Sequence, residues 1–293
     1  MSGLGATEFA SVNFGGGGAS ATFINPNFTI NSALPGARDL AATRTTVLGQ
    51  VLNKLFLQRG LNPPNGGSVG TVDFNGANAF DPDTKTLTVN GLAGGEQVGG
   101  TVSFLTNTSS SMSLGTFQVP SGNSSNILVV PSAKTNAGDV HEINVNATLL
   151  SGGAGTIRSV NSFLRDPGNP TVTLGPDLSS STVSTVATAP TRGCACNTPC
   201  SRSIQIAGSP RSSRPGVTQR RHRRAPGFLG NASSVDVTIP DFTGVGTWQA
   251  SWGLQTGALT TWQASASGWI AGSGGTSDGT ITRTAIRTGQ TTP

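Results

Sequence analysis

The chain has 293 residues, of which 11% are charged and 41 are glycine. Ordinary soluble domains carry about 25% charged residues, and this low charge with abundant Thr, Val and Gly favours pleated sheets joined by tight turns. Residues 191–226 contain eight arginines and no acid, and without those eight the formal net charge of +5 becomes −3. A basic surface spread over the whole fold is therefore excluded, and we do not expect nucleic acid as a partner.

Several other classes of protein are disfavoured by what the sequence lacks. No apolar run reaches the roughly 18 residues that a membrane span needs, so we expect no span. The start, MSGLGATEFASVNFGGGGAS, has neither the basic nor the apolar region of a secretory signal peptide. We expect a chain that stays inside until assembly or lysis, uses another export route, or has lost a leader. Catalytic and nucleotide-binding motifs are absent, so we expect neither enzymatic activity nor a cofactor.

Residues 1–35 are expected to form an extended, glycine-rich arm. The run FGGGGASATF is flexible by composition, and INPNFTINSALPG adds turn residues without a strand of useful length. Such an arm is suited to act as a tether or to drape over a neighbouring subunit.

The segment ARDLAATRTTVLGQVLNKLFLQRG predicts one amphipathic helix, within residues 36–60. Gly60 stands where a helix C-cap glycine belongs. Apolar residues recur every four positions in two adjacent rows, which are Val47, Val51 and Leu55, and Leu48, Leu52 and Phe56. The stripe is expected either to pack on the chain's own β-domain or to form a helix–helix contact between subunits, so these six residues are candidate subunit contacts.

Residues 68–168 are expected to form a first antiparallel β-sandwich. Clusters of Gly, Asn, Asp and Ser separate the strands at a spacing typical of a sandwich of about 100 residues. The strands are GTVDF, KTLTVNG, EQVGGTVSFLTN, LGTFQV, SNILVVP, VHEINVNATLL and TIRSVNSFL. His141 shares a strand face with Ile143 and Val145, so we expect a packed histidine rather than a catalytic one.

Three aspartates near the start of this sandwich are candidates for a calcium site at its edge, because they lie close enough in sequence to offer oxygens to one cation. They are Asp73, Asp81 and Asp83. The competing interpretation is that they form turns, which aspartate favours. No other metal site is expected.

Residues 169–293 are expected to form a second β-sandwich, within which residues 191–226 are anomalous. The three cysteines lie there with the spacing C-x-C-x3-C, and they are Cys194, Cys196 and Cys200, with His222 downstream. Structural zinc sites pair cysteines as C-x2–4-C beside a second ligand pair, which this segment lacks. The run QRRHRR suits contacts with phosphates, but no aromatic side chain lies nearby to stack on bases.

A local shift of reading frame explains more of this segment. Every Cys codon begins with TG, so a frame that starts one nucleotide earlier reads NTG at each cysteine, which encodes only Leu, Val or Met. The three cysteines then become apolar residues on one face of a strand. We therefore hypothesise that residues 191–226 are a frameshifted reading of strands that belong to the second sandwich.

Four tryptophans lie within 22 residues of the C-terminal module, namely Trp248, Trp252, Trp262 and Trp269. The sequence TWQAS occurs twice, at residues 247–251 and 261–265, which indicates two paired strands with aromatic residues on one face. If that face points inward, the rings form the core of the second sandwich. If it points outward, they form a platform for sugar rings or for another protein.

The sequence thus predicts a mainly β protein: two antiparallel β-sandwich modules preceded by the arm and one helix. The strand pattern resembles that of immunoglobulin-like and fibronectin-type modules in structural proteins of tailed-phage virions or in bacterial surface proteins. This resemblance implies a non-enzymatic structural or assembly protein of a virion or an extracellular surface, of the decoration or tail type, with other protein subunits as partners. The alternative is a secreted adhesin or carbohydrate-binding module that uses the tryptophan platform, with glycans as partners.

Overall fold

The protein is mainly β in a computed structural model that describes residues 1–48, 51–120, 122–151, 154–178, 182–186, 193–199, 203–210, 220–224, 234–238, 246–247, 259–271 and 275–292. Within these residues the helical structure consists of one 3₁₀ turn, η1 (Ser132–Lys134). The predicted mainly β class with antiparallel sheets is confirmed. No helix in the described part of the chain is long and apolar enough to cross a membrane.

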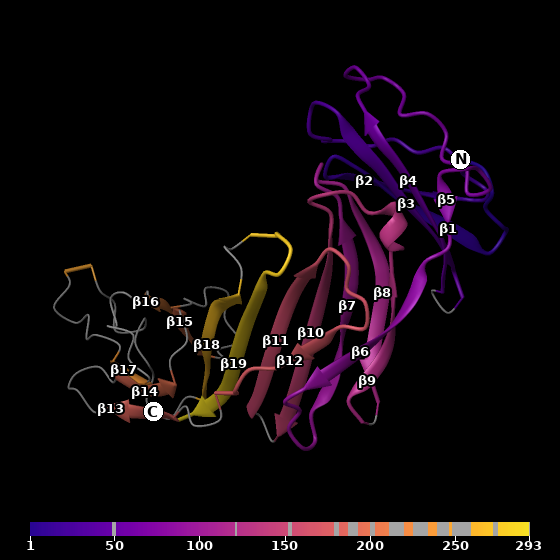
Figure 1. Ribbon diagram of the computed structural model, residues 1–293. Coiled ribbons are helices and arrows are strands. Elements are labelled where there is room, and N and C mark those ends of the chain that lie inside the picture. The colour runs from indigo at the N-terminus through magenta and orange to yellow at the C-terminus, as the bar shows by residue number, and fades with distance from the viewer. Residues whose placement is uncertain are drawn as a thin grey trace.

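A five-stranded sheet in the order β2-β1-β3-β4-β5 lies at one end of the elongated molecule, together with the N-terminus (Figure 1). Its strands are β1 (Glu8–Phe14), β2 (Gly17–Thr22), β3 (Arg38–Thr46), β4 (Leu52–Leu61) and β5 (Ala79–Phe80). We call it the N-terminal sheet.

The predicted arm is wrong over the first two of these strands, because residues 9–22 pair as the hairpin β1–β2. Gly15 and Gly16 form its two-residue turn, with φ of 54° and 85°. A type I′ hairpin turn needs positive φ at both central positions, which glycine adopts without strain. The glycine run that suggested a flexible tether is therefore the turn that fixes the register of the hairpin.

The predicted helix over residues 36–60 is also wrong, since β3 and β4 pair there as an antiparallel hairpin. Alternate residues of β4 reach opposite sides of the sheet. Leu55 and Leu57 join the core of the adjoining sandwich, whereas Phe56 packs with Val12 in a second core on the other side. Because both faces are covered, the strand lacks the alternation of apolar and polar residues that marks a half-buried strand.

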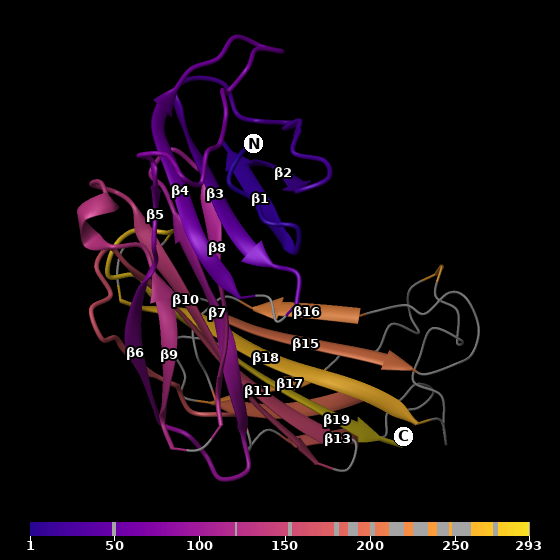
Figure 2. The same cartoon turned by 90° about the vertical axis from the view of Figure 1, so that its right-hand side faces the viewer.

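A β-sandwich follows (Figure 2). One layer is the three-stranded sheet β12-β6-β9, in which the pair β12–β6 is parallel, and the other is the β11-β10-β7-β8 part of a larger sheet. The strands are β6 (Asp83–Asn90), β7 (Gln97–Leu105), β8 (Ser111–Val119), β9 (Ser124–Val129), β10 (Val140–Ser151), β11 (Ala154–Leu164) and β12 (Thr171–Thr173). A bulge in β8 at Gly115 keeps both Leu114 and Phe117 on the buried side.

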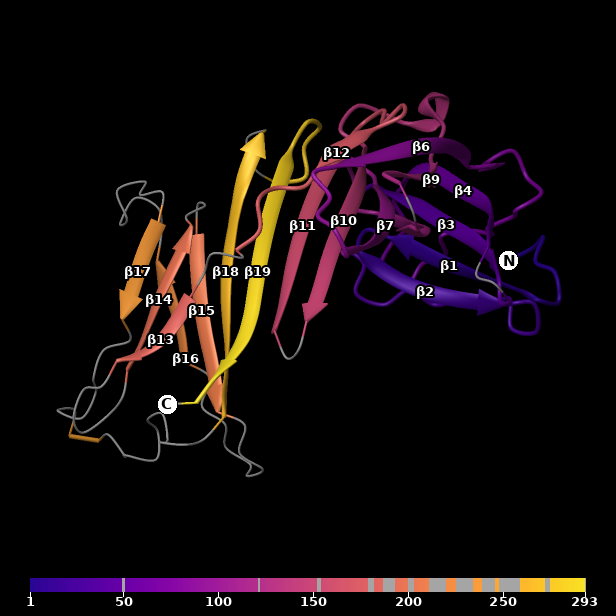
Figure 3. The ribbon, with the colours of Figure 1, turned by 90° about the horizontal axis from the view of Figure 1, so that it is seen from below.

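The large sheet continues beyond the sandwich. β19 (Ile281–Thr291) pairs with β11, and β18 (Thr260–Ala271) pairs with β19. β15 (Ser203–Pro210) and β16 (Arg220–Arg224) extend the sheet to eight strands, while β13 (Thr182–Val186), β14 (Gly193–Pro199) and β17 (Ser234–Thr238) form a separate sheet beside it (Figure 3). The domain boundary between residues 168 and 169 stays a prediction, and one sheet runs across it.

Three arginines on the inner face of the large sheet hold the segment that leaves β12. Arg283, Arg158 and Arg287 donate to the carbonyl oxygens of Thr173, Gly175 and Leu178, at 2.7, 2.7 and 3.1 Å. Arg158 is buried and also forms an ion pair with the buried carboxylate of Glu96, which compensates its charge away from water. The segment is thereby fixed across the inner face.

Arg59 on β4 ties the N-terminal sheet to the sandwich. Its guanidinium donates to a carboxylate oxygen of Asp39 at 2.7 Å, to one of Asp139 at 2.6 Å and to the carbonyl oxygen of Lys134 at 2.7 Å. The two carboxylates are only 4% and 0% exposed. They also accept main-chain N–H groups, from Gly60 for Asp39 and from Asn107 and Asn136 for Asp139. We call this set the Arg59 network.

We expect Arg59→Ala to lower the free energy of unfolding by about 3–5 kcal/mol, because it leaves two buried carboxylates without their cation. The measurement is urea denaturation followed by circular dichroism. Lys54→Ala is the matched control: its ammonium pairs with the exposed Asp81 at 2.9 Å, and we expect a loss of about 0–1 kcal/mol. Equal losses in the two variants would contradict the role given to Arg59.

Candidate functional site

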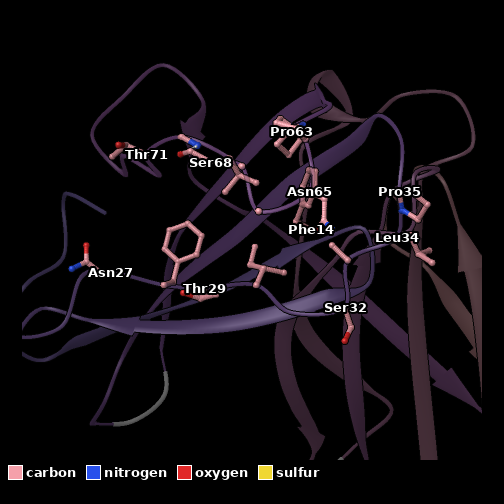
Figure 4. Close-up of a pocket in the computed structure, with 18 of the residues that line it drawn as sticks. Phe14, Asn27, Thr29, Ser32, Leu34, Pro35, Pro63, Asn65, Ser68 and Thr71 are labelled. Carbon is pink, nitrogen blue, oxygen red and sulfur yellow. Dashed lines mark hydrogen bonds between the residues drawn. The ribbon is translucent and has the colours of Figure 1, made fainter.

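A cleft of about 870 Å³ lies on the side of the N-terminal sheet that faces away from the sandwich (Figure 4). Two loops line it, residues 26–36 between β2 and β3 and residues 63–71 after β4, together with Met1 and Phe14. Its volume falls within the range of pockets that bind small ligands, about 300–1,000 Å³. It is therefore the candidate binding site of this part of the molecule.

The lining of the cleft contains no ionisable side chain. Prolines and apolar residues such as Phe28 and Leu34 alternate with Asn, Ser and Thr. The amino group of Met1 is held by the carbonyl oxygen of Pro26 at 3.2 Å. Proton transfer needs an ionisable group within reach of the substrate, so this cleft is suited to binding and offers no side chain for acid–base chemistry.

Sequence reasoning missed the cleft. Both loops carry signals of irregular structure, such as Asn-Pro in residues 25–28 and Pro-Pro in residues 62–65. These signals mark each loop separately. That the two loops face each other follows from the order of β1, β3 and β4 in the sheet, which the prediction of an arm and a helix did not contain.

The six predicted subunit-contact residues fall into two groups. Val47, Leu48 and Val51 lie at the turn between β3 and β4 and are 58, 80 and 57% exposed. The other three are buried, and they are Leu52, Leu55 and Phe56. In place of the predicted helical stripe the chain forms a hairpin whose β4 residues are packed and whose turn is apolar and exposed. We call the exposed residues Val47, Leu48 and Val51 the hairpin tip.

His141 is fully buried at the start of β10, on the same face as Ile143. The main-chain N–H of Val130 donates to its Nε2 at 2.9 Å, and Nδ1 lies 3.2 Å from the carbonyl oxygen of Leu164. Nδ1 therefore carries the proton and the ring is neutral. Burial lowers the pKa of His141, and both nitrogens are occupied by the main chain, as the sequence led us to expect of a packed histidine.

The three candidate calcium ligands do not converge. Asp73 accepts the main-chain N–H of Asn75 at 3.0 Å, and this bond, with one from the Ser2 side chain, lowers the pKa of Asp73. Asp81 pairs with Lys54, and Asp83 lies 3.7 Å from Lys85. Within the described part of the chain, no group of three His, Cys, Asp or Glu side chains could hold a metal ion.

Two of the four tryptophans, Trp248 and Trp252, lie outside the described residues. Trp262 and Trp269 both lie on β18, an odd number of residues apart and before its register shift, so they point to opposite faces. Trp262 lies over Gly289 on the neighbouring strand, where a Cβ would come within 2.3 Å of the ring. Trp269 is 50% exposed. These two rings therefore do not share one platform.

The cysteine segment lies largely outside the described side chains. Cys194 and Cys196 belong to β14, Cys200 lies outside the described residues, and His222 belongs to β16. The frameshift hypothesis and the absence of a zinc site there stay predictions.

No protein-family model matches the chain, and no curated protein or solved structure matches it either.

We expect the protein to lose stability as the pH falls below about 6.5, the ordinary pKa of histidine, because His141 has a lowered pKa when folded and the unfolded chain takes up the proton first. Its contribution is complete above that pH. The measurement is the urea midpoint from about pH 8 to about pH 5.

The matched variant is His141→Gln, in which this slope should vanish. Burial raises the pKa of Glu142, so Glu142 stabilises the fold at low pH and loses that effect as the pH rises. The comparison is therefore made in a Glu142→Gln background. A midpoint that does not change there between pH 7 and pH 5 would rule out a buried neutral His141.

Proposed function

We propose that the chain is a non-enzymatic structural subunit of a virion or of an extracellular surface assembly, of the decoration or tail type. It acts through contacts with other protein subunits. An immunoglobulin-like character of the sandwich belongs to the same proposal. The observation that carries it is the set of large apolar side chains left exposed at one end of the N-terminal sheet.

These side chains come from two segments at the same end of the sheet, on either side of β1. Phe9 on β1 pairs with Thr22 on one side and with Thr45 on the other, so the residues that follow β2 and β3 lie at the same end of the sheet. They are Phe23, Ile24, Val47, Leu48 and Val51, with exposed fractions from 55 to 92%. Single exposed apolar residues are ordinary, but a group of this kind supports a contact with another protein.

The open edge of the N-terminal sheet supports the same proposal. β2 is its outermost strand (Figure 3). In a hairpin with a two-residue turn, alternate residues point their N–H groups away from the partner strand, and here these are Gly18 and Ser20. Neither N–H has an acceptor among the described residues. β2 also has no charge or proline, the usual devices that block an edge.

The chemistry of the described residues supports a non-enzymatic role. The buried ionisable groups Asp39, Asp139, Glu96 and His141 are all engaged by main-chain or ionic partners of the fold. The cleft offers no ionisable side chain.

We expect the purified chain to associate with itself and the double variant Leu48→Ser with Val51→Ser to weaken this association at least about tenfold, since burying one such side chain stabilises by about 1.5–3 kcal/mol. The measurement is sedimentation velocity over a concentration series. Leu150→Ser is the matched control, because Leu150 is 77% exposed on another sheet. A monomeric wild type, or equal association of all three proteins, would overturn the proposal.

We expect Ser20→Pro to weaken the association as well. Proline removes an outward N–H at an edge position and leaves the pairing with β1 in place. Ser20→Ala keeps the N–H and should associate like the wild type. If Ser20→Pro keeps the wild-type circular dichroism and still associates normally, β2 is not part of the contact.

A further inference from the structure

The outer face of the large sheet carries a row of neutral side chains that crosses six adjacent strands. Cross-strand partners lie on the same face, and the register of the adjacent strands β18, β19, β11, β10, β7 and β8 (Figure 1) defines the row. Its members are Trp269, Thr282, Asn161, Asn144, Thr101 and Thr116. We call this surface the neutral face.

Three asparagine side chains on the neutral face are hydrogen-bonded to one another. Asn144 donates to Asn161 on β11, and Asn146 donates to the Oδ1 of Asn144. One row further, Gln118 lies across Gly99, where a Cβ would come within 2.7 Å of its amide. Each amide has two N–H donors and an acceptor oxygen with two lone pairs, so these bonds leave further hydrogen-bonding capacity unused.

Charge is distributed unequally between the two faces of the same strands. Arg158, Arg283 and Arg287 lie on the inner face, where they hold the segment after β12. The row of the neutral face contains no ionisable side chain, and the nearest one along β10 is Glu142 at its border. An anionic ligand would therefore find no cation in this row.

Trp269 closes one end of the row and is 50% exposed. An indole ring presents a large, rigid apolar surface at little entropic cost. Neutral sugars combine apolar ring faces with hydroxyl groups that both donate and accept hydrogen bonds. An exposed ring beside fixed amides and hydroxyls matches both properties.

We propose that the neutral face binds an uncharged polysaccharide laid across the strands, with Trp269 stacked on one sugar ring and the amides of Asn161, Asn144 and Gln118 hydrogen-bonded to hydroxyl groups. Five strand spacings of about 4.8 Å give a track of about 24 Å, long enough for several sugar units. A protein partner is less favoured here, since the centre of a protein interface is usually apolar. The inference does not depend on subunit contacts through the N-terminal sheet.

The test is native affinity electrophoresis of the full chain in gels that contain hydroxyethyl cellulose, dextran or galactomannan, with a polymer-free gel as reference. We expect at least one of these polymers to retard the wild type. Trp269→Ala should raise the dissociation constant about tenfold or more, as loss of a tryptophan anchor does. Phe23→Ala is the matched control, because Phe23 is an aromatic residue of similar exposure, 55%, that follows β2 of the N-terminal sheet; it should bind normally.

A second variant keeps the test decisive if Trp269→Ala unfolds. Thr282→Lys places a longer, charged side chain between the ring and Asn161 in the row, and it should also weaken retardation. Three outcomes would overturn the proposal: no retardation by any neutral polymer, retardation by heparin alone, or normal binding by both Trp269→Ala and Thr282→Lys. Loss of self-association in Trp269→Ala without polysaccharide binding would assign the face to a subunit contact instead.

Discussion

One guanidinium group supplies the charged contact between the N-terminal sheet and the sandwich. Arg59 reaches from β4 to Asp39 on its own sheet and to Asp139 on the sandwich, so the N-terminal sheet cannot separate from the sandwich without exposing a buried ion pair. Apolar packing alone would allow sliding, because it is not directional. The geometry of two carboxylates around one planar fork, together with the hydrogen bonds that join Asp39 to Thr108 and Ser110, fixes the orientation in which Leu55 and Leu57 enter the sandwich core.

That orientation decides which surfaces remain available. One face of the N-terminal sheet packs against the sandwich, and the other is covered by the loops that form the cleft. What stays open is the end of the sheet with the hairpin tip, and the edge strand β2. Surfaces of this kind suit contacts with other chains, whereas the buried ionisable groups are already used to hold the fold.

The sequence was informative where strands have one buried face. From KTLTVNG to TIRSVNSFL the alternation of residues predicts β6 to β11, and it also predicts a packed His141. It failed where both faces are buried, because Leu55, Phe56 and Leu57 then form a continuous apolar run that also fits a helical stripe. The glycine run that contains Gly15 and Gly16 predicts flexibility by composition, although paired glycines are equally a hairpin signal. The cleft and the neutral face depend on strand order and register, which local pattern does not contain.

Register also decides which side chains of the large sheet lie on its inner face and which lie on its outer face. Successive side chains alternate between faces, so Asn161 and Val160 on β11 point to opposite sides of the sheet. Their partners on β19, Thr282 and Arg283, point to the same sides as they do. Arg158, Arg283 and Arg287 fall on the inner side, where carbonyl oxygens of the segment after β12 accept their hydrogen bonds. On the opposite side, the row from Trp269 to Thr116 consists of amides, hydroxyls and one exposed indole. On β19 the register alone decides which residues face outward, and a shift of this strand by one residue would bring Arg283 to the outer face in place of Thr282.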